Sequence, residues 1–584
     1  MRKLLIYLQK YKKECVIAPL FKLLEASFEL IVPLVIAALV DKGIAMADRS
    51  YILKMGAILV LLALIGLICS VTAQFFAAKA AIGFGAKLRH SLFCHIETLS
   101  FAEMDTIGTS TLITRMTSDI NQVQSGVNLV LRLFLRSPFI VFGAMVMAFT
   151  VNVKAALVFV VTIPLLSVVV FTVMCASIPL YKKVQHGLDE VLGHTRENLE
   201  GARVLRAFHK EAEETEQFRD SNAFLTSMQL VVGRISTLMN PLTYIIINCA
   251  VLAVIWVGGK QVFSGIITQG EVIALVNYMS QILVELIKLA NLIVTVNKAI
   301  ACGNRIGEVL EVESSIKNEK TGQMAEEKNA PAVVFSHVSM SYAGSKEEAL
   351  TDITFEAKRG QTIGIIGGTG SGKSSVVNLI PRFYDVSSGS VLVNGRDVRD
   401  YNLVELRDKI GVVMQKAVLF EGTIAENLRW GKQDASEEEL WRAIEVAQAT
   451  DVVSGKEGKL DYRIEQGGRN LSGGQKQRLT IARAVVKDPE ILILDDSASA
   501  LDFATDAKLR TALRNLQGNK TIFIVSQRTS SIQFADQILV LDDGQAVGLG
   551  THEELLDRCE IYREIYESQF KKEDFRKQEK GGVR

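Results

Sequence analysis

The stretch Gly367-Gly368-Thr369-Gly370-Ser371-Gly372-Lys373-Ser374 decides how the rest of this chain of 584 residues is interpreted. An apolar run, Thr362–Ile366, precedes it, and Ser375-Val376-Val377-Asn378-Leu379-Ile380 follows it. This order predicts a buried strand, a glycine loop and the first turn of a helix. Glycines let backbone N–H groups fold around a phosphate chain, and the helix N-terminus adds a favourable dipole. We therefore interpret the stretch as a loop that binds a nucleoside triphosphate.

Further polar side chains are predicted to complete this site. Lys373 of the loop is placed to reach the β- and γ-phosphates, and Ser374 to bind Mg²⁺ through its hydroxyl. The strand Gly411–Gln415 ends in an amide, and the apolar strand Ile491–Asp495 ends in a carboxylate, where a metal ligand belongs in an open α/β sheet. Tyr342, in the upstream stretch Val338–Tyr342, can stack on the base, although simple packing is the plainer interpretation of a strand tyrosine.

A second phosphate-binding stretch is predicted between the strands Gly411–Gln415 and Ile491–Asp495. Leu471-Ser472-Gly473-Gly474-Gln475 opens a helix, and a serine with two glycines at a helix N-terminus favours anion binding. One chain with two phosphate-binding stretches about a hundred residues apart indicates that the second serves the nucleotide of another molecule.

Composition excludes several other classes of protein. The net charge of +1 carries no polybasic signature of nucleic-acid binding. The seven cysteines are scattered without a Cys-x-x-Cys pair, so neither a metal site nor a disulfide framework is supported. The basic N-terminus lacks an apolar core followed by small residues, and we expect no cleaved signal there.

The first half of the chain is predicted to be a membrane domain. A span takes about 20 apolar residues, because the hydrocarbon core is about 30 Å thick. Six stretches meet this length: Cys15–Val40, Tyr51–Ala78, Leu129–Phe149, Ala155–Leu180, Leu242–Phe263 and Val272–Val296. The two long loops between them, Lys79–Asn128 and Tyr181–Pro241, carry the basic residues, so the positive-inside rule places both loops and both ends of the chain in the cytoplasm.

Both long loops keep helical periodicity, so we expect the membrane helices to continue into the cytoplasm. Breaks at Asp105–Ser110 and Glu200–Ala202 lie at the tips of these arms. Each break is either a short cross-helix that contacts another domain or an ordinary surface loop.

Charged residues also occur inside the predicted spans. Glu29 and Arg136 lie far inside, and charges at membrane depth usually face a bundle interior or a wet cavity. These two are the candidate cavity residues. Structural pairing, or snorkelling near the interface, is the alternative for such charges, above all for Lys22, Arg132 and Lys288.

The predicted domain organisation follows from these patterns. Residues 1–313 form the six-span domain, and the polar, aperiodic residues 314–331 form a linker. Residues 332–570 form the nucleotide-binding domain, and residues 571–584 are a charged tail.

Together with Ser499-Ala500-Leu501-Asp502, these motifs resemble the nucleotide-binding domain of an ATP-binding cassette (ABC) transporter. Leu-Ser-Gly-Gly-Gln at this spacing is the most specific part of the resemblance. Six spans fused ahead of such a domain resemble an ABC exporter half-transporter. The fold implied is an all-α six-helix membrane domain with long cytoplasmic extensions, fused to an α/β P-loop ATPase domain with a helical subdomain.

The resemblance also implies ligands and a mechanism. ATP and Mg²⁺ bind at the phosphate loop, and two cassettes close head to tail, so that each ATP lies between one chain's loop and the other chain's Leu471–Gln475 stretch. Closure and hydrolysis alternate the membrane cavity between inward- and outward-facing states. The breaks near Gly108 and Gly201 resemble the coupling helices that dock on the cassettes.

This sequence departs from the family pattern at two positions of its own ATP site. The family expects glutamate after Asp495 as a general base, and this chain has Asp496. The family expects histidine after the later strand Thr521–Val525, and this chain has Gln527. The resemblance therefore points to the degenerate half of a heterodimeric exporter, with a partner chain that carries the glutamate and the histidine. Tolerated variants in an active homodimer are the alternative.

The predicted activity is ATP-driven export of small amphipathic or hydrophobic compounds, most simply across a bacterial cytoplasmic membrane, in contact with membrane lipids and without nucleic acid. An ATP-gated channel, a regulatory subunit, or an active homodimeric exporter of lipids or peptides is the alternative.

Overall fold

The computed structural model describes residues 2–316, 330–345, 347–497, 499–516 and 520–569. Its contacts divide the chain into two units. One consists of Met1–Glu97 with Ser110–Val312, and the other of Thr98–Thr109 with Glu313–Arg584. The predicted tail, 571–584, and most of the predicted linker, 314–331, lie outside the described residues.

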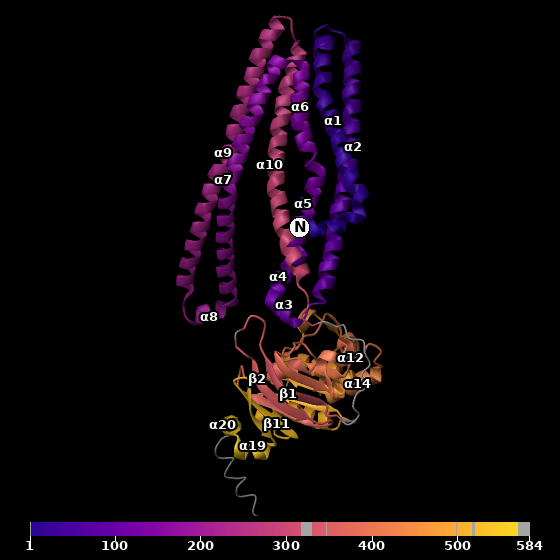
Figure 1. The fold of residues 1–584 in the computed structure, drawn as a ribbon, viewed down its shortest axis with the longest axis vertical. Helices are drawn as coiled ribbons and strands as arrows, with labels where there is room; N and C mark the ends of the chain where they lie inside the picture. Colours follow the sequence, from indigo (N-terminus) through magenta and orange to yellow (C-terminus); the bar gives the residue numbers. More distant parts are fainter. Residues whose placement is uncertain (1, 317–329, 346, 498, 517–519, 570–584) are drawn as a thin grey trace, which may run out of the picture. The chain divides into compact units, whose positions relative to one another are not determined.

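The described part of the first unit is helical, and it contains six helices long and apolar enough to cross a membrane (Figure 1). The prediction of six long apolar helices is confirmed, and each predicted stretch lies within one of them. The helical elements are η1 (Arg2–Tyr11), α1 (Lys12–Ala38), η2 (Leu39–Ile44), α2 (Arg49–Ile96), α4 (Thr109–Thr114), η3 (Arg115–Asp119), α5 (Ile120–Leu133), α6 (Arg136–Val151), α7 (Val153–Glu200), α8 (Ala202–Ala207), α9 (Glu211–Phe263) and α10 (Gln269–Glu311).

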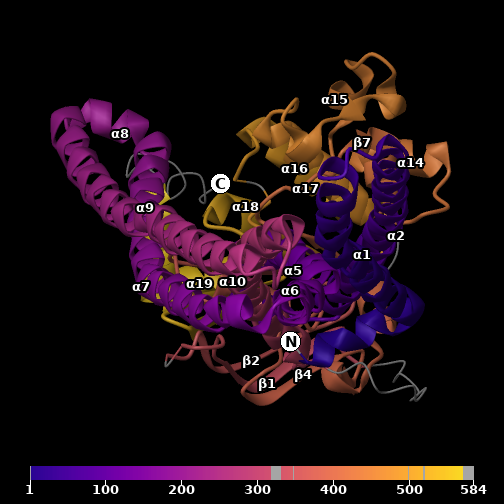
Figure 2. The same ribbon diagram turned by 90° about the horizontal axis from the view of Figure 1, so that it is seen from above.

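Four of these helices, α2, α7, α9 and α10, have 43 to 53 residues each, against about 20 for a membrane span. α2 and α7 have 48 residues each, which at about 1.5 Å per residue is more than twice the hydrocarbon thickness. α7 and α9 run side by side to the short helix α8 at their tip, apart from α1 and α2 (Figure 2). The helices therefore extend well past the spans, as their periodicity predicts.

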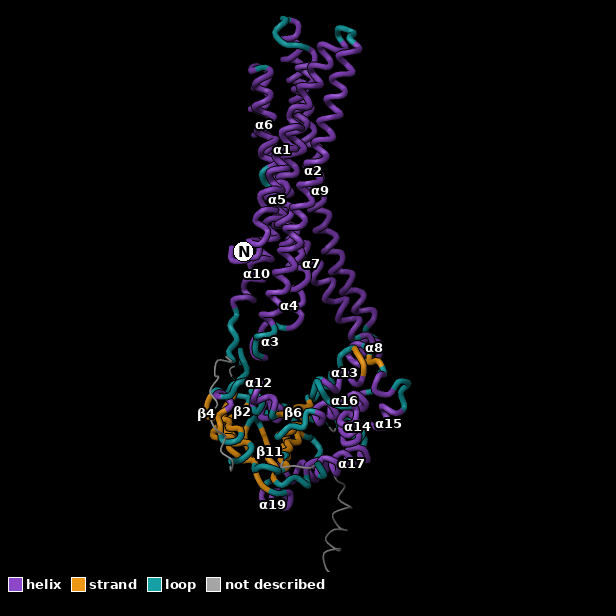
Figure 3. The backbone as a smooth tube through the Cα atoms, turned by 90° about the vertical axis from the view of Figure 1, so that its right-hand side faces the viewer, coloured by secondary structure: helices purple, strands orange, loops and turns teal. Residues whose placement is uncertain are grey.

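The second unit contains the strands (orange in Figure 3) in two main sheets. The six-stranded sheet has the order β12-β11-β3-β10-β9-β6, with parallel pairing throughout except at the β11–β12 edge. Its strands are β3 (Thr362–Gly367), β6 (Ile410–Val413), β9 (Ile491–Asp495), β10 (Thr521–Val525), β11 (Gln537–Asp542) and β12 (Gln545–Gly550). An antiparallel sheet joins β1 (Val333–Met340), β2 (Leu350–Ala357), β4 (Ser388–Val393) and β5 (Arg396–Asp397).

Helices cover the six-stranded sheet and form a separate helical region beside it. The helices are α11 (Lys373–Leu379), η4 (Val398–Asp400), α12 (Leu403–Asp408), α13 (Ile424–Arg429), α14 (Glu437–Val446), α15 (Thr450–Ser454), η5 (Lys459–Asp461), η6 (Gln466–Gly468), α16 (Gly473–Val486), α17 (Phe503–Arg514), α18 (Thr529–Ile532), α19 (His552–Arg558) and α20 (Glu560–Gln569). The short strands β7 (Gly422–Thr423) and β8 (Arg463–Ile464) pair within the helical region. The predicted fold class, a six-helix membrane domain followed by an α/β domain, is confirmed.

The short helix α3 (Phe101–Ile107) belongs to the second unit, although its sequence lies between helices of the first. It ends at Gly108, whose φ of +81° favours glycine, and this is where the sequence predicted a break. The ring of Phe101 packs 4.9 Å from that of Phe383, and Asp105 accepts a hydrogen bond of 2.7 Å from the hydroxyl of Tyr384.

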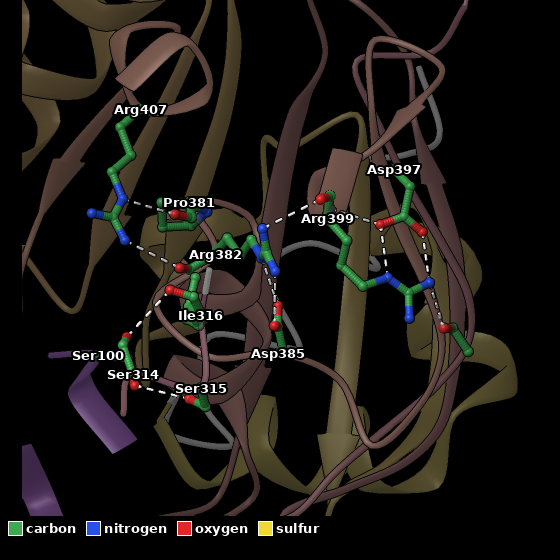
Figure 4. A network of polar contacts seen from close by, with 11 residues as sticks. Ser100, Ser314, Ser315, Ile316, Pro381, Arg382, Asp385, Asp397, Arg399 and Arg407 are labelled. Atoms are coloured by element: carbon green, nitrogen blue, oxygen red, sulfur yellow. Dashed lines mark hydrogen bonds and ion pairs between the residues drawn. The ribbon is translucent and has the colours of Figure 1, made fainter. Parts of the chain in front are cut away.

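Polar contacts stabilise the segment that carries Phe383 and Tyr384 (Figure 4). Arg407 donates to the carbonyls of Pro381 and Arg382, at 3.2 Å each, and Arg382 forms a two-pronged ion pair with Asp385. The surface under α3 is therefore held by Arg407 of α12 and by an ion pair within the segment itself.

Candidate nucleotide site

A pocket of about 320 Å³ lies at the carboxyl ends of the central strands β3, β9 and β10. Ligands bind at this edge of an open α/β sheet, because the loops that leave parallel strands diverge there. The lining residues are Tyr342, Ala349, Thr369, Gly370, Gly372, Lys373, Ser374, Ser375, Gln415, Asp495, Asp496, Val525, Ser526 and Gln527. The fold thus brings together most of the residues predicted for this chain's own nucleotide site.

The glycine loop between β3 and α11 has the backbone that a phosphate cradle needs. Gly370 and Gly372 have φ angles of +87° and +90°, in the left-handed region that favours glycine. A Cβ at Gly367 would clash with the carbonyl oxygen of Leu541, so a larger residue cannot stand there. Gly367, Gly368 and Ser371, also predicted for the loop, belong to it but do not line the pocket among the residues described.

Lys373 is held by the loop's own carbonyls. Its Nζ donates to Gly367 at 3.0 Å and to Gly368 at 2.5 Å. Burial lowers the pKa of Lys373, while the carboxylates of Asp495 and Asp496 act in the opposite direction. An ammonium held by loop carbonyls fits a triphosphate, whose oxygens can replace these carbonyls as acceptors.

Oxygen and amide groups suited to Mg²⁺ converge beside the lysine. The hydroxyl of Ser374 donates to the carboxylate of Asp495 at 3.1 Å. Burial raises the pKa of Asp495 above its ordinary value of 3.8, and the hydrogen bond from Ser374 partly offsets this rise. Gln415 lies two residues beyond β6 and donates to Asp496 at 3.5 Å. Hydroxyl, carboxylate and amide oxygens are the ligands that Mg²⁺ prefers, so the residues present fit the ion.

Tyr342 is tied to the helix that follows the loop. Its hydroxyl lies 2.8 Å from that of Ser375, and its ring meets the ring of Tyr384 edge-on at 5.2 Å. The side chain remains 36% exposed, which leaves ring surface available to a base at the edge of the pocket.

Asp496 and Gln527, the two departures from the family pattern, line the same pocket. Asp496 has a φ of +45°, a conformation that aspartate tolerates better than most residues. Its N–H donates to Val525 at 3.0 Å, and its carbonyl accepts from the hydroxyl of Ser499 at 2.8 Å. The backbone that presents the Asp496 side chain is therefore held from both sides.

The stretch Leu471–Gln475 lies elsewhere, and none of it appears in the lining of this pocket among the described residues. Ser472 caps α16, and its N–H donates to the side chain of Gln475 at 3.0 Å, which completes a capping box. Leu471 is buried, while Ser472 and Gly473 are exposed. This helix N-terminus is thus preformed and open on its outer side.

The stretch Ser499–Asp502 packs between the loop that carries Asp496 and the N-terminus of α16. A Cβ at Gly474 would lie 3.0 Å from the carbonyl oxygen of Ala500, and Leu501 is buried. Asp502 caps α17 through the N–H of Thr505 at 3.2 Å. The stretch therefore links the strand end that carries Asp496 to the N-terminus of α16.

The membrane unit contains a second pocket, of about 310 Å³, between α1 and α10. Glu29 lines it with a side chain that is 40% exposed. Arg136 does not line it among the residues described, because its buried guanidinium pairs with Glu29 at 2.7 Å and with Glu285 at 2.6 Å. The structure thus brings the two candidate cavity residues together, with Glu29 on the wall and Arg136 behind it. The sequence could not show that Arg136 lies against Glu285, because the two residues are far apart in the chain.

Replacing Arg136 by methionine is expected to lower the free energy of unfolding by about 3–5 kcal/mol, because it leaves the buried carboxylate of Glu285 without its main counter-ion. Glu285→Gln added to Arg136→Met should recover most of this loss. The measurement is thermal unfolding in detergent. The control is Lys288→Met, which removes the half-exposed partner of Glu285 at 2.8 Å and should cost much less. Equal losses for the two single variants would contradict a buried structural pair.

Comparison with known proteins places both halves of the chain in one family. Residues 15–286 match the ABC transporter transmembrane region, and residues 350–499 match the ABC transporter family. The chain is 36% identical to the uncharacterized ABC transporter ATP-binding protein YfiB of Bacillus subtilis over 573 residues, which is 98% of this chain and 99% of the relative.

Two further relatives have more informative names. The putative multidrug export ATP-binding/permease protein YgaD of Bacillus subtilis is 31% identical over 98% of each chain. The ATP-dependent lipid A-core flippase of Desulfotalea psychrophila is 33% identical over 82% of this chain and 84% of its own length. With fused membrane and ATPase domains, the chain belongs to the ABC transporter family, as a multi-pass, exporter-type half-transporter.

Proposed function

We propose that this chain is one half of a heterodimeric exporter, with an ATP site of its own that binds ATP but hydrolyses it slowly. Its Leu471–Gln475 stretch completes the competent site of a different chain, which carries the glutamate and the histidine. The observation that carries the proposal is the grouping of Asp496 and Gln527 in one pocket, while the capped N-terminus of α16 keeps the family's motif.

Each substitution weakens a separate part of hydrolysis. Aspartate is one methylene shorter than glutamate, so its oxygens fall about 1.5 Å short, and general-base catalysis depends on hydrogen-bond reach. Gln527 can form hydrogen bonds but cannot carry a positive charge near neutral pH. The binding groups remain in place, which favours a site that holds ATP without rapid turnover.

The remaining pocket residues are proposed to bind and orient the nucleotide. Lys373 and the loop N–H groups hold the phosphates, and Ser374, Gln415 and Asp495 hold Mg²⁺. Tyr342 packs on the adenine. Hydrolysis at the partner's competent site would supply the energy that drives transport, and Mg²⁺ would neutralise phosphate charge in this pocket. The stretch Ser499–Asp502 lies at the contact between the two cassettes.

The proposed substrates are small amphipathic or hydrophobic compounds, and the names of the multidrug-export and flippase relatives support this class. Glu29, exposed on the wall of the membrane pocket, is the proposed contact for a polar group of the substrate. Both ends of the chain are proposed to lie in the cytoplasm, on the basis of the basic long loops. The membrane is proposed to be a bacterial cytoplasmic membrane, because the chain resembles short half-transporters.

ATP turnover by this chain purified alone in lipid, measured beside its stoichiometry by mass, tests the proposal. We expect retained ATP binding with turnover near the background rate, because no competent site forms without the other chain. Brisk hydrolysis by a homodimer would overturn the heterodimer proposal and show that Asp496 and Gln527 suffice.

A further inference from the structure

The last described helix, α20, ends against the segment that follows β10. The side-chain oxygen of Gln569 accepts from the N–H of Thr529 at 2.9 Å and from its hydroxyl at 3.0 Å. The side-chain nitrogen of Gln569 donates to the carbonyl of Gln527 at 2.7 Å. One amide group therefore bonds to the backbone on both sides of Arg528.

The two bonded residues differ in how firmly the rest of the unit holds them. Thr529 is fully buried at the start of α18. Gln527 is exposed and lines the nucleotide pocket. The hydrogen bond from Gln569 thus ties the pocket end of this segment to its buried end, and it fixes the orientation of the peptide group that follows Gln527.

The helix that carries Gln569 is itself well anchored. Tyr562 of α20 is fully buried, and its hydroxyl lies 2.8 Å from Nδ1 of His552. Tyr566, one turn later, is also buried and packs on the same histidine ring. A side chain on such a helix can hold a loop in one position, because the helix backbone that carries it is itself fixed.

The segment is also connected to the stretch that faces the other cassette. The guanidinium of Arg528 lies 5.0 Å from the centre of the Phe503 ring and donates to the carbonyl of Ser499 at 3.5 Å. A shift of the Gln527 peptide group would therefore change the contacts of Ser499–Asp502 as well as the lining of the pocket.

We propose that Gln569 is a positioning residue for the nucleotide site: it fixes the backbone at Gln527 and so places the side chain of Gln527 toward the terminal phosphate of ATP. The inference rests on the proposed function, which puts ATP in this pocket. An unrestrained segment must be ordered when the ligand binds, and that ordering opposes binding. ADP lacks the terminal phosphate, so its affinity should not depend on Gln569.

The test measures binding of MgADP and of a non-hydrolysable Mg·ATP analogue to the full chain in lipid nanodiscs. Gln569→Ala is expected to weaken the analogue about fivefold to tenfold, as the loss of one or two hydrogen bonds predicts, and to leave ADP within about twofold. Gln569→Glu should show the same selective loss, because a carboxylate cannot donate to the Gln527 carbonyl. The matched control is Glu567→Ala, an exposed change on the same helix.

A double-mutant cycle distinguishes positioning from a general structural effect. If Gln569 acts through Gln527, Gln569→Ala should have no further effect on analogue affinity in a Gln527→Ala background. If Gln569→Ala weakens the binding of both nucleotides equally, or of neither, the inference is overturned. The proposed function still stands in that case, provided that the unsubstituted chain binds ADP normally. An unsubstituted chain that binds neither nucleotide would overturn both.

Discussion

Replacing Gly473 by aspartate is expected to lower ATP turnover of the assembled transporter by about a hundredfold or more, the size of effect seen when an anion-stabilising contact is lost from an active site. ATP binding at this chain's own pocket should not change, because Gly473 does not line it among the described residues. In the proposed dimer, the N-terminus of α16 faces the partner's ATP. A carboxylate at that point repels the phosphates that the helix end would otherwise attract.

The fold of this chain should tolerate the substitution. Gly473 is the first residue of α16 and is exposed, and beyond its chain neighbours and its own helix backbone no described atom lies within 4 Å of a Cβ built on it. A negative charge in the first turn of a helix is stabilising, so the thermal midpoint should stay the same or rise slightly. A stable protein with lost turnover is therefore the expected combination.

The experiment compares turnover, nucleotide binding and thermal unfolding for the complex isolated through a tag on this chain. Gly473→Asn is the matched control, since asparagine has nearly the size of aspartate without its charge. We expect a smaller loss for Gly473→Asn. Unchanged turnover in Gly473→Asp would show that α16 does not face a hydrolysed nucleotide.

Restoring both family residues, Asp496→Glu with Gln527→His, is expected to raise turnover at this chain's own site by about tenfold or more, since a positioned general base contributes at least that much. Glutamate gains the missing reach, and histidine supplies a group that can be charged near the γ-phosphate. Part of the gain is offset by the φ of +45° at residue 496, which suits aspartate better than glutamate.

Turnover at this site can be separated from turnover at the partner's site. The double change is introduced together with Gly473→Asp. This third substitution is expected to abolish hydrolysis at the partner's site without affecting hydrolysis at this chain's own site. The single variants serve as controls, and Asp496→Asn should change total turnover little in the otherwise unaltered complex. No rise in the restored variant would mean that the slowness of this site has another cause.

Much of this protein could be predicted from the sequence, because the decisive features are local. The spans depend on runs of about 20 apolar residues, and the phosphate loop depends on glycine spacing between a strand and a helix. Gly367–Ser374 and Leu471–Gln475 each form one helix N-terminus from consecutive residues. The departures at Asp496 and Gln527 are likewise visible by position, once the motifs around them are recognised.

The tertiary structure decided which distant residues meet. Arg136 was a candidate for the cavity wall, but the packing of three helices places it behind the wall, between Glu29 and Glu285. Thr98–Thr109 belongs to the same unit as Glu313–Arg584, although more than 200 residues of sequence separate the two. The ring of Phe101 packs on that of Phe383 there. Gln569 carries no motif, and only the docking of α20 brings it to Gln527. Local sequence determines helices, strands and loop backbones, whereas long-range contacts depend on how the finished elements pack, and no short pattern encodes that.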